Sequence, residues 1–304
     1  PGPRPRIPGV AQGQGAGAGR ELGERMKTGD GDSQHSRPWL FYGLAFGIAW
    51  TAWAPLVLHK LGLVRLPVPH VIALFVGQTL GAFAPLLSLA VMQRFPGCGA
   101  LVAGVLRKVR FAGVPPAWYV VPALTPVALT ALITLSHGAL SGEATPLMRP
   151  GPVQELGWAL VLVIPFQFVL GMIGSPLGEE PGWRGYVLDG FARRDRALSG
   201  SAVVACLWWV WHVPLFVVLG VDWGVPQFVT MVSHSLLIDS LFLLSGRNLL
   251  VAMLYHQGIN TSFMFLVSKA ETPGGSAAFA LIALIIRAAV HRRCRGSTTD
   301  EVTS

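Results

Sequence analysis

Two adjacent carboxylates form the first group of residues that could carry chemistry. Glu179 and Glu180 directly follow a long apolar run, and Arg184 comes four residues after Glu180. On a helix this spacing puts Glu180 and Arg184 on one face, where they can form an ion pair. Because neighbouring carboxylates repel each other, Glu179 would then be the freer group and could act as a general base. The alternative is an ordinary helix end that carries surface charges.

Histidines inside two later apolar runs form the second group. His212 follows three tryptophans, which we interpret as packing or interfacial anchors, and precedes Pro214, which perturbs a helix. His256 and Asn260 are four residues apart and so share one helical face. Both can donate hydrogen bonds into one cavity, as an oxyanion hole requires, and His256 could instead bind a metal ion. The alternative at both places is a polar contact between packed membrane helices.

These groups together indicate hydrolysis. A hydrolase needs a base that activates water and donors that stabilise the oxyanion of the tetrahedral intermediate. A divalent metal ion such as zinc, bound by Glu179, His212 and His256, would also activate water. The sequence has no His-Glu-x-x-His motif, and its three cysteines lack the spacing of a zinc site or a disulfide framework. The sequence therefore leaves a metal ion open as an alternative.

The chain that must position these residues has the composition of a membrane protein. Its 304 residues are 52% hydrophobic and 12% charged, whereas soluble chains are about 25% charged. The mean hydropathy is +0.54. A net charge of +8 would suggest nucleic acid for a soluble chain, but the basic residues here lie mostly between apolar runs. We therefore expect a lipid bilayer as partner and no nucleic acid.

Eight apolar runs are long enough to cross a bilayer, which needs about 20 residues as helix. Backbone groups in lipid must pair internally, which favours helices over other structures. We therefore expect an all-α polytopic membrane protein with about eight transmembrane helices around a buried polar cavity. The predicted spans are 39–58, 71–92, 117–137, 156–177, 201–220, 225–244, 249–267 and 276–290.

Basic residues between the runs predict the orientation. If the N-terminus is cytoplasmic, twelve arginines and lysines lie on the inner side and four on the outer side. The outer four are Lys60, Arg65, Arg149 and Lys269, and the inner twelve are Arg94, Arg107, Lys108, Arg110, Arg184, Arg193, Arg194, Arg196, Arg247, Arg292, Arg293 and Arg295. We expect both termini in the cytoplasm and a bacterial cell membrane as the location.

The composition also divides the chain. Residues 1–38 are rich in glycine, proline and arginine, and we expect a disordered N-terminal tail. Residues 39–290 form one membrane domain, and residues 291–304 a basic, disordered C-terminal tail. The chain does not begin with methionine, and we expect the native start at Met26, with residues 1–25 as an upstream extension.

The three motifs in this order resemble the CPBP family of intramembrane endopeptidases, also called the Abi or type II CAAX prenyl endopeptidase family. The resemblance covers about residues 150–270. The family's second motif usually begins with phenylalanine, where this chain has Trp208, and we expect this change to alter the pocket and leave the chemistry intact. The matching positions are Glu179, Glu180 and Arg184, then His212, then His256 and Asn260.

The resemblance implies an intramembrane protease that cleaves a membrane-associated protein or peptide. Removal of a C-terminal tripeptide from a prenylated protein is the family's reaction, but prenylation of the substrate need not extend to a bacterial-type member. Glu179 would activate the water, and Glu180 and Arg184 would shape its charge. The family leaves open whether a metal ion takes part.

The resemblance assigns the remaining positions to the carbonyl of the scissile bond. His212 would act as base or metal ligand, and His256 and Asn260 would polarise the carbonyl. Straight helices, however, put Glu179 near the inner membrane boundary and His212 some 16 Å deep, at about 1.5 Å per residue. A helix break near Pro176 would hold the glutamates inside, and we expect a cavity that opens toward the cytoplasm.

Two functions without proteolysis remain as alternatives. A catalytically silent immunity or scaffold protein would bind a partner in the membrane and would not need intact motifs. A proton-coupled transporter also uses intramembrane carboxylates and histidines, but the chain has no inverted repeat that would support this function.

Overall fold

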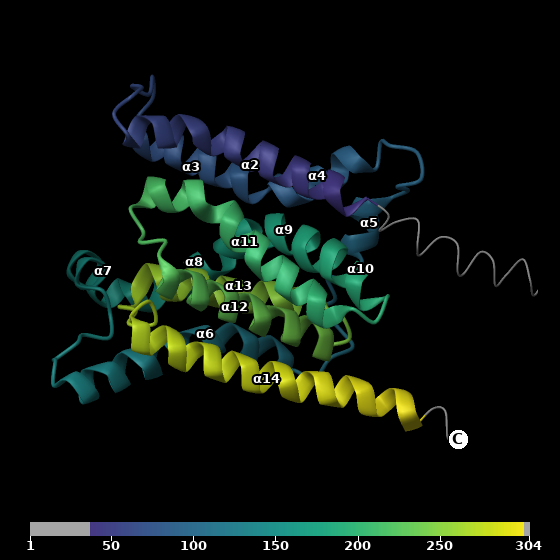
Figure 1. Ribbon diagram of the computed structural model, residues 1–304. Coiled ribbons are helices and arrows are strands. Elements are labelled where there is room, and N and C mark those ends of the chain that lie inside the picture. The colour runs from purple at the N-terminus through teal and green to yellow at the C-terminus, as the bar shows by residue number, and fades with distance from the viewer. Residues whose placement is uncertain (1–36, 301–304) are drawn as a thin grey trace, which may run out of the picture.

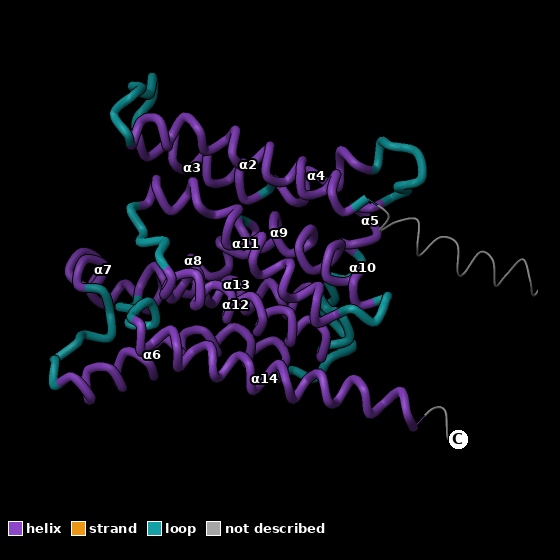
Figure 2. Tube along the Cα trace, in the orientation of Figure 1, coloured by secondary structure: helices purple, strands orange, loops and turns teal. Residues whose placement is uncertain are grey.

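The computed structural model describes residues 37–300, with side chains to residue 290. This part of the chain consists of helices and loops, and none of these residues forms a strand (Figure 2). The predicted all-α fold is therefore confirmed. The predicted disordered tail and the expected start at Met26 lie outside the described residues, except that the first described helix already begins at Pro38.

The helices follow one another with short connections. In chain order they are α2 (Pro38–Lys60), α3 (His70–Ala82), α4 (Ala84–Met92), α5 (Leu101–Leu106), α6 (Ala117–Ser141), α7 (Pro150–Leu156), the 3₁₀ turn η1 (Gly157–Ala159), α8 (Leu160–Ile173), α9 (Ser175–Glu180), the π-helix η2 (Pro181–Leu188), α10 (Asp189–Ala192), α11 (Ala197–Leu219), α12 (Val225–Leu244), α13 (Leu249–Phe265) and α14 (Pro273–Asp300).

The number of membrane spans differs from the prediction. Within residues 37–300, six helices or helical runs are long and apolar enough to cross a membrane, and the pair α3–α4, bent by 46°, raises this number to seven. Helix α13, predicted as the seventh span, has 17 residues and lies in the middle of the bundle (Figure 1). The chain is a multi-pass membrane protein, but the count of eight spans is not confirmed.

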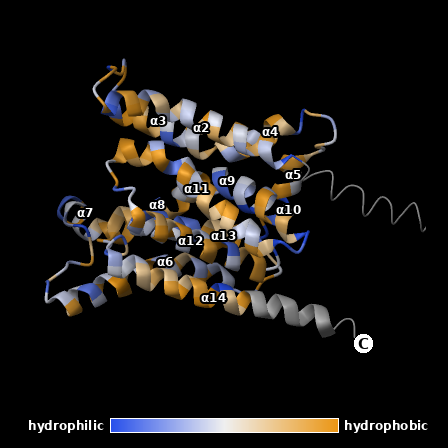
Figure 3. Cartoon of the chain, viewed as in Figure 1, coloured by the Kyte–Doolittle hydropathy of each residue, from blue (hydrophilic) through white to orange (hydrophobic). Residues whose placement is uncertain are grey.

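The helices pack in three layers in the view of Figure 1. Helices α2, α3 and α4 form one outer layer, α6 and α14 form the other, and α8 to α13 lie between them. Across the layers α2 packs on α11, α13 on α6, and α12 on α14. Apolar residues cover the outer faces (Figure 3), where side chains such as Phe75, Leu124, Val161 and Leu281 are exposed, as lipid-facing residues are.

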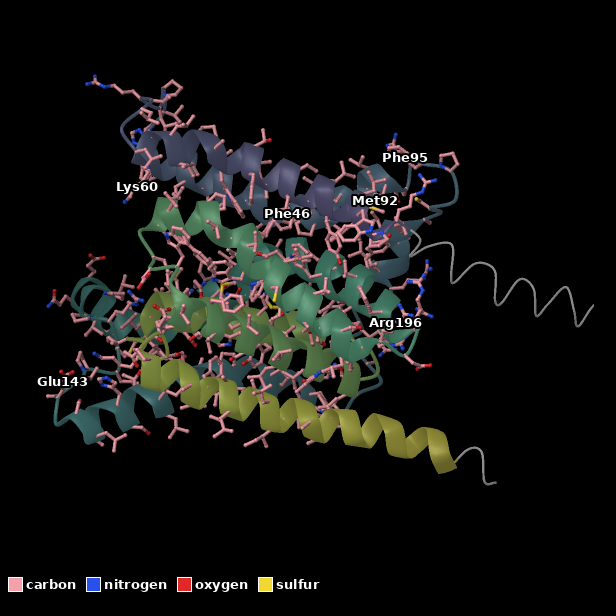
Figure 4. The ribbon with its side chains drawn as sticks, viewed as in Figure 1. Phe46, Lys60, Met92, Phe95, Glu143 and Arg196 are labelled. Carbon is pink, nitrogen blue, oxygen red and sulfur yellow. The ribbon has the colours of Figure 1, made fainter. Side chains whose placement is uncertain are left out.

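The two ends of the bundle are distinct. Lys60 and Glu143 lie at one end and Phe95 and Arg196 at the other (Figure 4). We call them the Lys60 end and the Arg196 end. The predicted orientation puts the Arg196 end in the cytoplasm. Helix α14 continues toward the Arg196 end as far as Asp300, although we expected a disordered tail from residue 291; residues 301–304 lie outside the described part.

The fourth apolar run is interrupted and longer than predicted. Helix α8 ends at Ile173, Gly174 leaves the helical conformation with φ −75° and ψ −113°, and α9, η2 and α10 then continue to Ala192. The predicted end of this span at residue 177 was therefore wrong, and the expected break is present a few residues earlier than we placed it. Eight residues of π-helix directly follow the glutamates, a conformation that is rare and often found at functional sites.

The interruption fits against the bend between α3 and α4. A Cβ atom on Gly178 would clash with the backbone of Ala82 and Phe83. Glycine is therefore required for α9 to pack this closely. Arg184, six residues further along, is fully buried. The prediction of orientation counted Arg184 among the cations of the inner loops. Without it, eleven basic residues lie on the predicted inner side and four on the outer side. The predicted orientation still follows from that difference.

Candidate active site

Glu179 is held by two neutral donors. The Ser175 hydroxyl donates to its Oε1 atom over 2.6 Å, and the indole N–H of Trp208 donates to Oε2 over 2.7 Å. The side chain of Glu179 is buried with 2% exposure and lines a cavity. Trp208 occupies the position that is phenylalanine in the related motif, and phenylalanine has no N–H to donate. The exchange thus adds a contact to Glu179 and is more than a change of pocket shape.

Glu180 belongs to a separate network of charges. Its Oε1 atom accepts from Arg184 Nη1 at 3.2 Å and lies 2.6 Å from His256 Nδ1. Arg184 also donates through Nε to Asp239 over 2.9 Å and through Nη2 to Ser235 over 2.6 Å. We call Glu180, Arg184, Asp239 and His256 the buried charge cluster. The predicted ion pair is confirmed, and Glu179 is the carboxylate left to neutral partners.

His256 has a partner on each ring nitrogen. Nδ1 contacts Glu180, and Nε2 lies 3.2 Å from the Ser175 hydroxyl. Asn260, one turn further along α13, donates through Nδ2 to Gln257 over a long 3.4 Å. A role of His256 in polarising a substrate carbonyl stays a prediction, and His256 would first have to exchange Ser175 for the substrate oxygen.

His212 projects from α11 with one ring nitrogen occupied. Its Nδ1 atom lies 2.8 Å from the carbonyl oxygen of Trp208. A carbonyl only accepts hydrogen bonds, so Nδ1 carries the proton and Nε2 is the basic atom of the neutral ring. Because the ring lines the cavity, Nε2 is the atom that can exchange a proton with a substrate or water.

The cavity brings together four of the six predicted site residues. Its volume is about 560 Å³, and Glu179, His212, His256 and Asn260 all line it. Glu180 and Arg184 lie behind its wall and do not line it. The walls come from helices of all three layers, and most of the surface that lines the cavity is apolar. The arrangement gives a carboxylate, an imidazole and an amide access to one largely apolar space.

The cavity opens toward lipid and toward the Lys60 end. Phe75, Phe263 and Met264 line it and are 71%, 46% and 47% exposed, so part of its wall faces outward. It also reaches Val221 and Glu271 in the loops of the Lys60 end. The predicted orientation puts this end outside the cytoplasm. The expected opening toward the cytoplasm and the predicted orientation therefore do not agree, and both stay predictions.

A second set of charges surrounds Asp189, further along the interrupted helix. Lys108 Nζ and Arg193 Nε lie 2.9 and 2.8 Å from its Oδ2 atom, and Arg247 Nη1 lies 3.1 Å from Oδ1. We call these four residues the Asp189 cluster. Burial lowers the pKa of Lys108, and the Asp189 carboxylate counteracts that effect. The cluster ties the end of the interrupted helix to two loops.

The side chains do not fit a three-ligand metal site. Both oxygens of Glu179 accept hydrogen bonds, and both nitrogens of His256 have partners. Of the three predicted ligands, only His212 keeps a nitrogen for a metal ion. Among the residues that the structure describes, no group of three or more His, Cys, Asp or Glu side chains could hold a metal ion.

Sequence reasoning missed two residues that contact Glu179. Ser175 precedes it by four residues, one helical turn, and this spacing was a usable signal. Trp208 was noted for its position, but a sequence cannot show that its N–H points at a carboxylate on another helix. Asp239 contributes one step further away, through its hydrogen bond with Arg184.

Comparison with known proteins agrees with the motifs. Residues 157–262 match the family model described as type II CAAX prenyl endopeptidase Rce1-like. The matched segment contains all six predicted site residues as well as Ser175 and Trp208. A search of curated proteins found no match. This match to the type II CAAX prenyl endopeptidase Rce1-like family supports the CPBP resemblance that the motifs indicated.

Proposed function

We propose that this protein is an intramembrane endopeptidase that hydrolyses a peptide bond in a membrane-associated protein or peptide. One observation carries the proposal. Glu179 lines an apolar cavity together with His212 and Asn260, and its hydrogen bonds come from the neutral donors Ser175 and Trp208. A carboxylate held in this way can take a proton from water, as a general base must.

The two glutamates have different partners, and this difference supports the mechanism. The ion pairs with Arg184 and His256 involve Glu180. Glu180 therefore balances the buried cation, while Glu179 keeps its capacity to accept a proton. Water activated by Glu179 adds to the scissile carbonyl carbon, and Glu179 takes the proton that the leaving amine later receives.

The oxyanion of the intermediate needs donors on the cavity wall. The amide of Asn260 has a hydrogen left beyond its long bond to Gln257. A protonated His212 would add Nε2–H, because its Nδ1 already donates to the Trp208 carbonyl. Such donors stabilise the charge that develops in the transition state. The donors present do not form a three-ligand metal site, so no step of this mechanism passes through a metal ion.

The cavity indicates the class of substrate. Its apolar walls and its opening past Phe75 and Phe263 suit a segment that arrives from the lipid phase. The family reaction extends this to CAAX-type processing, the removal of C-terminal residues from a lipid-modified protein. We propose peptide-bond cleavage in a lipid-embedded segment as the activity and CAAX-type processing as its form.

Comparative proteomics of membrane-protein termini tests the proposal. Cells with the wild-type protein are compared with cells that carry Glu179→Gln or His212→Ala. We expect new termini in the wild type alone and a loss of cleavage of at least about 10²-fold in both variants, because each removes a proton-transfer group. Glu143→Gln, at a loop carboxylate that is 62% exposed, is the matched control and keeps full cleavage.

The outcome also separates proteolysis from membrane scaffolding. All variants must be present in the membrane at wild-type levels. Identical termini in wild-type and Glu179→Gln cells, with the cellular phenotype retained, would overturn the proposal and favour a silent scaffold or immunity protein.

A further inference from the structure

The hydroxyl group of Ser175 lies between two groups that can each hold a proton. It is 2.6 Å from Glu179 Oε1 and 3.2 Å from His256 Nε2. The other ring nitrogen of His256 is 2.6 Å from Glu180. Ser175 is the first residue of α9, directly after the break at Gly174. The helix break therefore sets this hydroxyl between α9 and α13.

Ser175, which is partly buried, differs in this respect from the buried serines inside other helices. Ser88, Ser233, Ser240 and Ser262 each donate to the carbonyl four residues earlier in their own helix. That local bond is the ordinary choice for a serine inside a helix. Ser175 instead contacts two ionisable side chains, one of them on a different helix.

The single hydrogen of the Ser175 hydroxyl limits how this group can bond both partners at once. A hydroxyl has one hydrogen to donate. If Ser175 donates to Glu179, a neutral His256 with its proton on Nδ1 leaves Nε2 open to receive a proton, and Nε2 can donate to the serine oxygen only after it has received one. If Ser175 donates to His256, then Glu179 must be protonated to keep its own bond to the serine oxygen. The two arrangements differ by one proton moved between Glu179 and His256.

We propose that Ser175 relays a proton between Glu179 and His256, an inference that rests on the proposed peptidase function. After water attack, Glu179 holds a proton on a carboxyl oxygen. In the relay the Oε1–H bond of Glu179 breaks as an O–H bond forms at Ser175, and the original serine O–H bond breaks as Nε2–H forms at His256. Glu179 regains its negative charge, His256 becomes positive beside Glu180, and Ser175 is unchanged.

The relay gives His256 a defined function in the cycle. Glu180 contacts Nδ1 and stabilises the ring when it is positive. The proton stored on His256 returns along the same path when the leaving amine needs it. Ser175 acts through Glu179 and His256 and is a positioning residue, because the reacting carbonyl need not touch it.

Steady-state kinetics in proteoliposomes test the relay. The probe is a quenched fluorogenic peptide that ends in a prenylated CAAX sequence, and the variants are Ser175→Ala, Ser175→Thr and Ser88→Ala. We expect Ser175→Ala to lower kcat by about 10²-fold while KM changes less than about twofold, because the change removes the proton path and one hydrogen bond to Glu179 but none of the apolar cavity wall. Ser175→Thr keeps the hydroxyl and should lie within about tenfold of the wild type. Ser88→Ala, which removes a buried hydroxyl of α4, should match the wild type.

A measurement without turnover separates the relay from the proposed function. The ¹⁵N chemical shift of His256 Nε2 reports whether this atom carries a proton. We expect Glu179→Gln to move the shift at fixed pH when Ser175 is present, and to move it at most a third as far in the Ser175→Ala background. Equal movement in both backgrounds, or full kcat in Ser175→Ala, overturns the relay. If the wild-type protein does not cleave the peptide, the proposal of CAAX-type cleavage is overturned. The ¹⁵N shift of His256 still tests the proton relay in that case.

Discussion

Two clusters of charge each include residues of the same interrupted helix, and their surroundings differ. In the buried charge cluster Glu180, Arg184 and Asp239 have no exposed surface, and the cluster adjoins the cavity. In the Asp189 cluster the carboxylate is fully buried, but the side chains of Lys108, Arg193 and Arg247 are 19%, 48% and 35% exposed. The first cluster is closed to solvent, and the second reaches the surface of the Arg196 end.

We infer from this difference that the buried charge cluster supports the proposed chemistry, whereas the Asp189 cluster anchors the fold. A fully buried cation needs every donor satisfied, because an unpaired buried charge is strongly destabilising. Arg184 accordingly uses Nε, Nη1 and Nη2 on three acceptors. The cations around Asp189 keep contact with water, so each of them can be lost at lower cost. We expect substitutions to follow this order.

The largest effect should come from Arg184→Met. The change leaves the carboxylates of Glu180 and Asp239 buried without their shared cation. We expect the free energy of unfolding to fall by about 3–5 kcal/mol, as for other broken buried ion pairs. Denaturation in mild detergent, followed by tryptophan fluorescence, measures it. A loss below about 1 kcal/mol would contradict the description of this cluster as closed to solvent.

Asp189→Asn should have an intermediate effect. It removes the carboxylate that three cations share, but these cations can turn toward water. We expect a loss of about 1–3 kcal/mol in the same denaturation assay. The pKa of Lys108 should fall further, because the carboxylate that opposes the effect of burial is gone. Cleavage by the folded fraction should stay within about twofold of the wild type, and a loss as large as that of Glu179→Gln would assign Asp189 to the chemistry.

Arg193→Ala should have the smallest effect. Its side chain is 48% exposed, and Asp189 keeps Lys108 and Arg247 as partners. Partly exposed ion pairs contribute about 0.2–1 kcal/mol, and we expect a loss in that range. Denaturation at low and high salt distinguishes the two clusters, because the contribution of Arg193 should shrink with salt and that of Arg184 should not. Equal salt dependence would remove the distinction between them.

The sequence predicted the helical fold because long apolar runs in lipid have few other solutions. It also predicted the pairing of Glu180 with Arg184, which depends only on a spacing of four residues. The span ends were less predictable. Hydropathy treats Glu179 and Glu180 as the end of a run, whereas the protein buries both of them by pairing and hydrogen bonding inside the bundle.

The contacts between helices could not be predicted in the same way. That the N–H of Trp208 points at Glu179 depends on how α11 rotates against α9, and neither helix specifies this alone. The bond between Arg184 and Asp239 joins residues 55 positions apart in the chain. Three-dimensional packing decides such contacts, and the periodicity of one helix does not contain them.

The close approach of Gly178 to the bend between α3 and α4 makes the position of Glu179 a property of two separate helix defects. The residues at the bend, Ala82 and Phe83, are remote from Glu179 in the chain, yet α9 rests on their backbone. A mutation that straightens this bend would displace Glu179, the proposed general base, while leaving every motif intact. Relatives with complete motifs can therefore differ in activity through the neighbouring helix, and a survey of the motifs alone would overlook it.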